Sequence, residues 1–116
     1  MGLSTHVLDT MNGRPAAGMK VALFEVINGQ YVLLQEHVLN ADGRVQGGLI
    51  DNDHLRAGQY RLTFEVASYF KGLEVSLPEP NFLNLVNLDF GVANPKEHYH
   101  VPLLVSPWSY STYRGS

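Results

Sequence analysis

The sequence predicts an all-β fold, a two-sheet antiparallel β-sandwich with at most one short helix. Short segments in which apolar and polar residues alternate recur along the 116 residues, as expected of strands that bury one face. Turn signals rich in Gly, Asn and Pro separate these segments at intervals of about 8–12 residues. Strands of this length and spacing are typical of a sandwich.

The first three predicted strands occupy the N-terminal third of the chain. Leu3–Asp9 is the first, and Thr10–Pro15, which contains Asn-Gly and Pro, ends it as a loop. Met19–Val26 is the second strand. Asn28-Gly29 follows it and is the strongest hairpin signal in the sequence. Tyr31–Leu39 is therefore expected to pair back as the third strand.

The remaining strands lie in the C-terminal half. Gln59–Ser68 shows the clearest alternation of apolar and polar residues, and Val86–Val92 alternates in the same way. Tyr99–Val105 places its aromatic and aliphatic residues on one face. Pro107 interrupts that strand, so Trp108–Gly115 is expected to return beside it as a final hairpin.

The segments between these strands are predicted to be mostly irregular. Asn40–Gly43 is a turn that places Arg44 directly after it. A short helix fits only Ala67–Gly72 or part of Asp51–Ala57. Gly72–Asn84 contains two prolines and is predicted to be a loop.

Composition predicts one folded domain over residues 1–116. Apolar residues make up 45% of the chain and charged residues only 16%, so some apolar surface is expected to face another subunit. The net charge is −3, and the eight Lys and Arg residues are spread along the chain. This distribution gives no basic patch for nucleic acid or an anionic membrane, and neither is expected as a partner.

The residue types that are missing narrow the function further. The chain has no cysteine, which excludes disulfides, thiolate catalysis and zinc sites built on Cys. No apolar run approaches the roughly 20 residues needed to span a bilayer. The first residues show no secretory signal, so a cytoplasmic location is expected, with a periplasmic one open if a signal peptide has been removed.

The five histidines are the first candidates for acid–base chemistry, because imidazole exchanges protons near neutral pH. His37 and His54 lie among polar residues and are interpreted as surface residues. His98 and His100 are two residues apart on a predicted strand and share a face, opposite the core face that begins at Tyr99. A histidine on a strand is more often structural than catalytic.

His6 and Arg44 add to this face only if the fold brings them to it. The first strand and the last hairpin of a sandwich can be neighbours, but spacing along the chain does not establish that. Arg44 follows a turn, where a solvated surface charge is the ordinary interpretation. The alternative is a clamp for an anion or a carbonyl group.

The sequence gives only weak support to a zinc site and still weaker support to a serine hydrolase. His6, His98 and His100 could bind zinc through three imidazoles and activate a water molecule, but no nearby carboxylate completes a recognisable motif. A serine hydrolase is disfavoured because the chain has no Gly-x-Ser-x-Gly elbow.

Three segments together resemble one family. They are Leu3-Ser4-Thr5-His6-Val7-Leu8-Asp9 with Gly13 and Pro15-Ala16 after it, Asn40-Ala41-Asp42-Gly43-Arg44, and His98-Tyr99-His100-Val101-Pro102-Leu103-Leu104 through Tyr113-Arg114-Gly115-Ser116. In order and spacing they are similar to the transthyretin-related proteins that act as 5-hydroxyisourate hydrolases. The Tyr-Arg-Gly-Ser ending is the specific part, because it separates the hydrolases from transthyretin, the hormone carrier.

The resemblance implies a transthyretin-like sandwich of about eight strands that assembles as a homotetramer, a dimer of dimers with active sites where the dimers meet. Carried over to this sequence, it implies a catalytic group of His6, Arg44, His100 and the terminal Ser116. Tyr113 and Arg114 would bind substrate by shaping the site. The resemblance assigns His98 no catalytic role.

The reaction implied by the resemblance is hydrolytic ring opening of 5-hydroxyisourate to 2-oxo-4-hydroxy-4-carboxy-5-ureidoimidazoline, a step of urate degradation in purine metabolism. No metal or organic cofactor is expected. A histidine would deprotonate the attacking water and Arg44 would stabilise the developing charge. The alternative from another class is a non-enzymatic carrier of a small ligand on the same scaffold, since one fold hosts unrelated functions.

Overall fold

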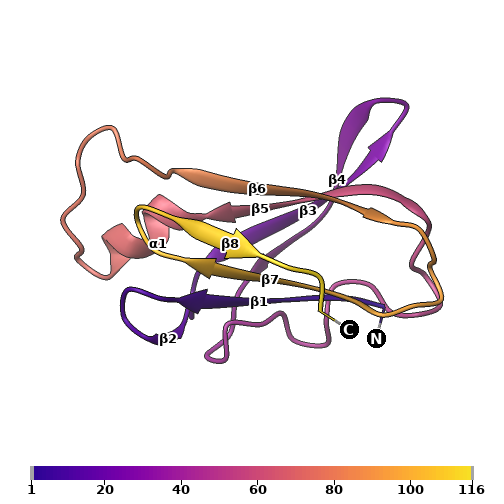
Figure 1. Ribbon diagram of the computed structural model, residues 1–116, viewed down its shortest axis with the longest axis horizontal. Helices are drawn as coiled ribbons and strands as arrows, with labels where there is room; N and C mark the ends of the chain where they lie inside the picture. Colours follow the sequence, from indigo (N-terminus) through magenta and orange to yellow (C-terminus); the bar gives the residue numbers. More distant parts are fainter. Residues whose placement is uncertain (1, 116) are drawn as a thin grey trace.

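The computed structural model describes residues 2–115 and shows two four-stranded sheets packed face to face (Figure 1). Sheet A has the strand order β2 (Arg14–Pro15), β1 (Leu3–Asp9), β7 (Tyr99–Val105) and β8 (Tyr110–Thr112). Sheet B has the order β4 (Gln30–Val38), β3 (Lys20–Ile27), β5 (Gly58–Glu65) and β6 (Leu85–Val92). The predicted two-sheet all-β sandwich is confirmed.

The strands pair antiparallel, with one exception in sheet A. β1 and β7 run parallel, in a register that sets Leu3 opposite Tyr99 and Asp9 opposite Val105. Parallel neighbours need a long connection, and here most of the chain, including all of sheet B, lies between them. The pairing brings the first and the last long strands into the middle of one sheet.

The structure corrects the prediction at the end of the strand expected over Gln59–Ser68. β5 ends at Glu65, and the helix α1 (Val66–Gly72) begins at the next residue. Its buried residues lie at helical spacing and cover one end of the core; they are Val66, Ala67, Tyr69 and Phe70. The helix predicted over Ala67–Gly72 is therefore confirmed, one residue longer, whereas Asp51–Ala57 forms turns instead. Within residues 2–115 no helix is long and apolar enough to cross a membrane.

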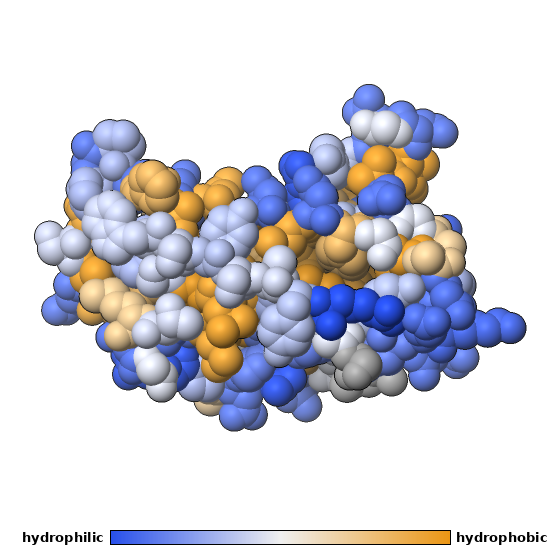
Figure 2. All heavy atoms as spheres, viewed as in Figure 1, coloured by the Kyte–Doolittle hydropathy of each residue, from blue (hydrophilic) through white to orange (hydrophobic). Residues whose placement is uncertain are grey.

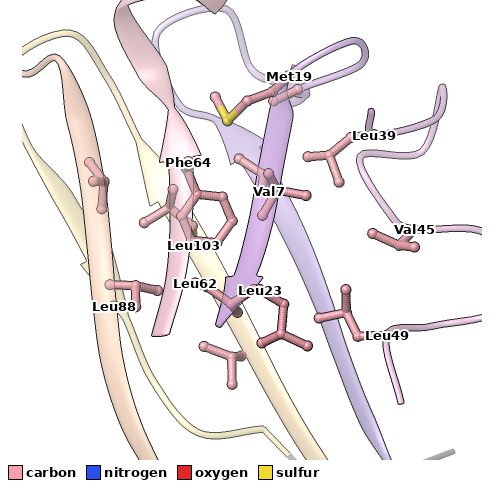
Figure 3. Packing of buried hydrophobic residues seen from close by; sticks show 14 of the residues in the cluster. Val7, Met19, Leu23, Leu39, Val45, Leu49, Leu62, Phe64, Leu88 and Leu103 are labelled. Atoms are coloured by element: carbon pink, nitrogen blue, oxygen red, sulfur yellow. The ribbon is translucent and has the colours of Figure 1, made fainter. Parts of the chain in front are cut away.

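The core lies between the two sheets (Figure 3). Alternate residues of neighbouring strands point into it, such as Leu23 on β3, Leu62 on β5 and Leu103 on β7, all fully buried. Leu39, Val45 and Leu49 come from the segment after β4 and close the side of the core next to β1. Burial of each such aliphatic side chain stabilises the folded state by roughly 1.5–3 kcal/mol. This core fixes which residues of sheet A face outward.

A buried carboxylate ends β1. Asp9 is 1% exposed and accepts hydrogen bonds from the backbone and side-chain nitrogens of Asn12, at 3.0 and 2.7 Å, and from Tyr69 Oη at 2.8 Å. Burial and the bond to Asp9 raise the pKa of Tyr69 to about 12. The network therefore attaches the C-terminal end of β1 to α1.

The open edge between β6 and β8 leaves apolar and aromatic surface in contact with solvent. Figure 2 shows apolar atoms reaching the surface between polar patches on this side of the molecule. A pocket of about 370 Å³ lies at this edge, lined by residues that include Phe90 on β6 and Tyr99 on β7. Two of the lining residues, Tyr110 and Tyr113, are 46% and 61% exposed, and Leu85 at the start of β6 is 50% exposed.

Candidate active site

The outer face of sheet A carries the polar residues of its two central strands. Because β1 and β7 are in parallel register, Ser4 lies opposite His100 and His6 lies opposite Pro102. Their neighbours in sequence point inward and are buried in the core, as Thr5 and Val101 show. The histidines of the first and last long strands are thus adjacent on one face, which spacing along the chain could not establish.

A tight turn places Arg44 beside His6. Asn40 Oδ1 accepts hydrogen bonds from the backbone nitrogens of Asp42 and Arg44, at 2.9 and 3.1 Å. Gly43 adopts φ +72°, and a Cβ there would lie 2.5 Å from the Val7 carbonyl oxygen. Glycine is therefore required where the turn packs against β1.

The same turn bonds directly to the edge of β1. Val7 N donates to the Gly43 carbonyl at 2.9 Å, and His6 and Arg44 form an antiparallel bridge pair. Residues paired across a bridge point to the same side, so the Arg44 side chain joins the outer face of sheet A. Arg44 is exposed and His6 is half-buried.

The C-terminal tail continues β8 along β7. Gly115 N donates to the His100 carbonyl at 2.7 Å, and His100 N donates to the Gly115 carbonyl at 3.2 Å. This pair keeps the antiparallel register that sets Leu103 opposite Thr112. Tyr113 therefore lies on the His100 side of the sheet. Ser116 falls outside the described residues.

Arg114 lies on the other side of the tail and has its own partners. Its Nη2 donates to Glu97 Oε1 at 2.9 Å and to the His98 carbonyl at 3.2 Å. Its guanidinium also stacks 4.0 Å from the centre of the Tyr99 ring. These contacts fasten the tail to the segment that leads into β7.

The surroundings of His6 and of His100 both favour the neutral imidazole. Partial burial lowers the pKa of His6, the Arg44 guanidinium lowers it further, and the backbone and carboxylate of Asp42 oppose the shift. Burial also lowers the pKa of His100, with further lowering by Arg44, His6 and His98. Neutral imidazoles beside a fixed cation are able to accept a proton from water near neutral pH.

One hydroxyl that sequence reasoning missed joins two of the histidines. Ser4 Oγ lies 2.8 Å from His100 Nδ1 and 3.1 Å from His98 Nε2. Ser4 is only 6% exposed. No local signal in the sequence marks Ser4, because its contact with the two histidines depends on the pairing of β1 with β7.

Two hollows lie on either side of this cluster. One, of about 240 Å³, is lined by Ser4, Arg44 and the loop that follows Arg44. The other, of about 470 Å³, is lined by Glu97, His98, Arg114 and Gly115. The pocket of about 370 Å³ at the β6–β8 edge does not include His6, Arg44 or His100.

The described residues allow acid–base and electrostatic chemistry at this face. Between residues 2 and 115, no three His, Cys, Asp or Glu side chains are arranged to hold a metal ion. The structure brings together His6, Arg44 and His100, three of the four residues that the resemblance implied for a catalytic group. Their catalytic roles, and the substrate-binding roles of Tyr113 and Arg114, stay predictions.

Known proteins match this chain over nearly its full length, in sequence and in structure. A 5-hydroxyisourate hydrolase from Deinococcus radiodurans is 52% identical over 115 residues, 99% of this chain and 96% of that protein. The structure of Klebsiella pneumoniae 5-hydroxyisourate hydrolase matches with a TM-score of 0.80 at 35% identity, over 98% of this chain and 97% of that one. Sea bream transthyretin in complex with thyroxine matches with a TM-score of 0.85 at 26% identity, over 99% and 95% of the two chains.

The fold is therefore transthyretin-like, as the resemblance implied. The model of the HIUase/Transthyretin family matches residues 3–115, which include the β1 segment, the turn before Arg44 and the tail. This chain belongs to the HIUase/Transthyretin family.

Proposed function

We propose that this chain hydrolyses 5-hydroxyisourate to 2-oxo-4-hydroxy-4-carboxy-5-ureidoimidazoline. The observation that carries the proposal is the cluster of His6, Arg44 and His100 on the outer face of sheet A. Relatives that are about half identical over nearly their full length carry the name 5-hydroxyisourate hydrolase, which supports the same reaction here. A carrier of apolar ligands has no need of two imidazoles and a guanidinium at one place.

Hydrolysis of a cyclic amide needs a base for water and a cation for the oxyanion. One of the two neutral imidazoles, His6 or His100, removes a proton from water as the oxygen attacks a ring carbonyl carbon. The ring C–N bond then breaks, and the leaving nitrogen receives that proton. Burial and Arg44 hold the pKa of both imidazoles low, which keeps the base unprotonated at neutral pH.

Arg44 and the tail complete the proposed site. The guanidinium stabilises the negative charge that develops on the carbonyl oxygen. Tyr113 lies on the His100 side of the tail and contacts substrate, whereas Arg114 holds the tail in place through Glu97 and Tyr99. Ser116 orients the attacking water.

The activity is tested by the ultraviolet decay of 5-hydroxyisourate generated from urate by an oxidase. We expect the protein to accelerate decay well above the spontaneous rate. His6→Ala and His100→Ala are each expected to lower turnover by roughly 100-fold or more. His54→Ala is a matched control, because His54 is exposed and bonds only to neighbouring Asp51. Decay at the spontaneous rate with wild-type protein would reject the hydrolase and favour the carrier.

The alternative of a zinc site is tested by metal analysis and by the same assay after chelation. We expect metal analysis of the active protein to find no stoichiometric metal and turnover to survive chelation. Loss of turnover on chelation, restored by zinc, would instead assign His6, His98 and His100 to a metal site.

We further propose that the chain works as a homotetramer, a dimer of dimers. Two surfaces suit such an assembly: the open edge of β6 and β8 with its aromatic pocket, and the outer face of sheet A around the histidines. Light scattering should give four times the 12.9 kDa mass of one chain. A mass of 12.9 kDa at assay concentration, with full activity, would contradict a site that needs two dimers.

A further inference from the structure

Ser4 occupies an unusual place for a serine. It lies in the middle of a sheet, is 6% exposed, and points to the outer face of sheet A rather than into the core. Its hydroxyl touches two imidazole rings from the neighbouring segment, whose centres are 6.4 Å apart. A buried polar group needs a partner, but one imidazole would satisfy it. The second contact calls for a separate explanation.

The single proton of the Ser4 hydroxyl determines how its two contacts differ. A serine hydroxyl has one proton to donate, so it donates to one ring nitrogen and accepts from the other. If Ser4 donates to His98 Nε2, then His100 Nδ1 carries the proton that Ser4 accepts. In the neutral His100 ring, Nε2 is then unprotonated. The tautomer of His100 is therefore tied to the state of His98.

We propose that Ser4 is a positioning residue that links His100 to His98 in a hydrogen-bonded chain, holding His100 Nε2 unprotonated for water and passing positive charge to His98. The proposal rests on the hydrolysis proposed above and deepens it. It identifies His100 as the general base. His98, to which the sequence assigned no catalytic role, holds the transferred proton until the ring C–N bond breaks.

The hydrogen-bonded series of His100, Ser4 and His98 has its original protons back at the end of each turnover. As water attacks the ring carbonyl, its proton moves to His100 Nε2. His100 Nδ1–H passes its proton to Ser4 Oγ, and the hydroxyl proton of Ser4 moves to His98 Nε2. When the ring C–N bond breaks, His100 Nε2 gives its proton to the leaving nitrogen, and the two transfers along the chain reverse. No co-reactant is needed.

The charges around His100 favour movement of positive charge away from it, toward Ser4 and His98. His100 faces the Arg44 guanidinium and His6 on one side, and both disfavour a second positive charge there. His98 lines one hollow together with Glu97 and Arg114. The Glu97 carboxylate is paired with the Arg114 guanidinium at 2.9 Å, and the same guanidinium donates to the His98 carbonyl at 3.2 Å, so this pair adds no net charge beside His98. Positive charge is therefore disfavoured at His100, which favours its passage along the hydrogen bonds through Ser4.

Kinetics of single variants test the positioning role. Ser4→Ala removes the hydroxyl and should lower kcat about 10- to 100-fold, as loss of an orienting partner typically does, with KM little changed. Ser4→Thr keeps the hydroxyl and should restore most of kcat. His98→Gln keeps a hydrogen-bonding group near Ser4 but cannot carry the proton, so kcat should fall as in Ser4→Ala. Ser111→Ala, exposed on the same face of β8, is the matched control and should leave kcat unchanged.

A second readout separates failure of this inference from failure of the hydrolase assignment. Imidazole ¹⁵N chemical shifts report the tautomer of each histidine without substrate. We expect His100 to carry its proton at Nδ1 in the wild-type protein and in Ser4→Thr, and to lose that preference in folded Ser4→Ala. A wild-type His100 protonated at Nε2, or unchanged shifts and kcat in Ser4→Ala, would overturn the proposal even if the protein is an active hydrolase. Wild-type shifts as expected without turnover would reject the hydrolase and, with it, the role of Ser4 in catalysis.

Discussion

The outward faces of the two sheets carry similar residue types but use them differently. On sheet B, Arg61 of β5 donates to both oxygens of Asp89 on β6, at 2.7 and 3.0 Å, and stacks on Tyr31 of β4. On sheet A, Arg44 lies beside two imidazoles whose pKa it lowers, and forms no ion pair with the residues described. The first arrangement joins strands, whereas the second disfavours protonation of its neighbours. A cation kept next to histidines is better explained by chemistry than by stability.

The largest expected effect separates these two arginines. Arg44→Ala should lower turnover of 5-hydroxyisourate by roughly 100-fold or more, because the oxyanion loses its cation. Arg61→Ala removes the same side chain from the other sheet and should leave turnover unchanged. Initial rates at matched protein concentration, with folding checked by circular dichroism, make the measurement. Equal losses in the two variants would remove the distinction between the faces.

A pair of glycines gives a second, smaller contrast. A Cβ on Gly115 would lie 3.1–3.2 Å from Cδ2 and Cβ of His100, whereas one on Gly91 of β6 would meet only the end of the flexible Gln59 side chain at 3.1 Å. Gly115→Ala should displace the imidazole by a few tenths of an ångström and lower kcat about 10-fold. Gly91→Ala should be neutral. A fully active Gly115→Ala would show that the position of the His100 ring tolerates adjustment.

The pH dependence of turnover should follow Arg44 and not Arg61. Catalysis needs a neutral imidazole, and Arg44 lowers the pKa of both His6 and His100. Removing the cation raises both pKa values, so the base becomes protonated at a higher pH. The acidic limb of the kcat profile should therefore move to higher pH in Arg44→Ala and stay in place in Arg61→Ala. A shift in the opposite direction would contradict the electrostatic assignment.

The smallest effect is expected on stability. Arg61 and Asp89 lie at the surface, where an ion pair is screened by solvent and contributes little. Asp89→Asn should lower the melting midpoint only slightly, and Arg44→Ala should not lower it at all. A large loss of stability in Arg44→Ala would make that residue structural, like its counterpart on sheet B.

Much of the fold was predictable because alternation along a strand reflects burial directly. The bounds of β3, β4 and β7 agree with the sequence prediction within one residue. The end of β5 was missed because Val66 continues the alternation and also begins the helical spacing of α1. The two-residue β2 was missed because Arg14–Pro15 reads as a loop, and only its contact with β1 defines it.

The site was predictable in its residues but not in its connections. His6, Arg44 and His100 could be named from resemblance, whereas their meeting depends on the parallel register of β1 with β7 and on the turn that ends at Arg44. Nothing local marks Ser4, because its hydroxyl gains meaning only from a partner 96 residues away. Likewise, Arg114 could be placed in the tail, but its attachment to Glu97 and Tyr99 follows from the side of the sheet on which it lies.

The parallel pairing of β1 with β7 also sets when the site can form. A ribosome releases Ser4 and His6 long before His100, so β1 must wait for nearly the entire polypeptide before it finds its neighbour. Closing so long a loop is slow, and contacts of high sequence separation form late in folding. Sheet B, joined by the β3–β4 hairpin and other nearer segments, has no such delay. During refolding, recovered turnover should lag behind the β-sheet signal, and it reports the completion of sheet A.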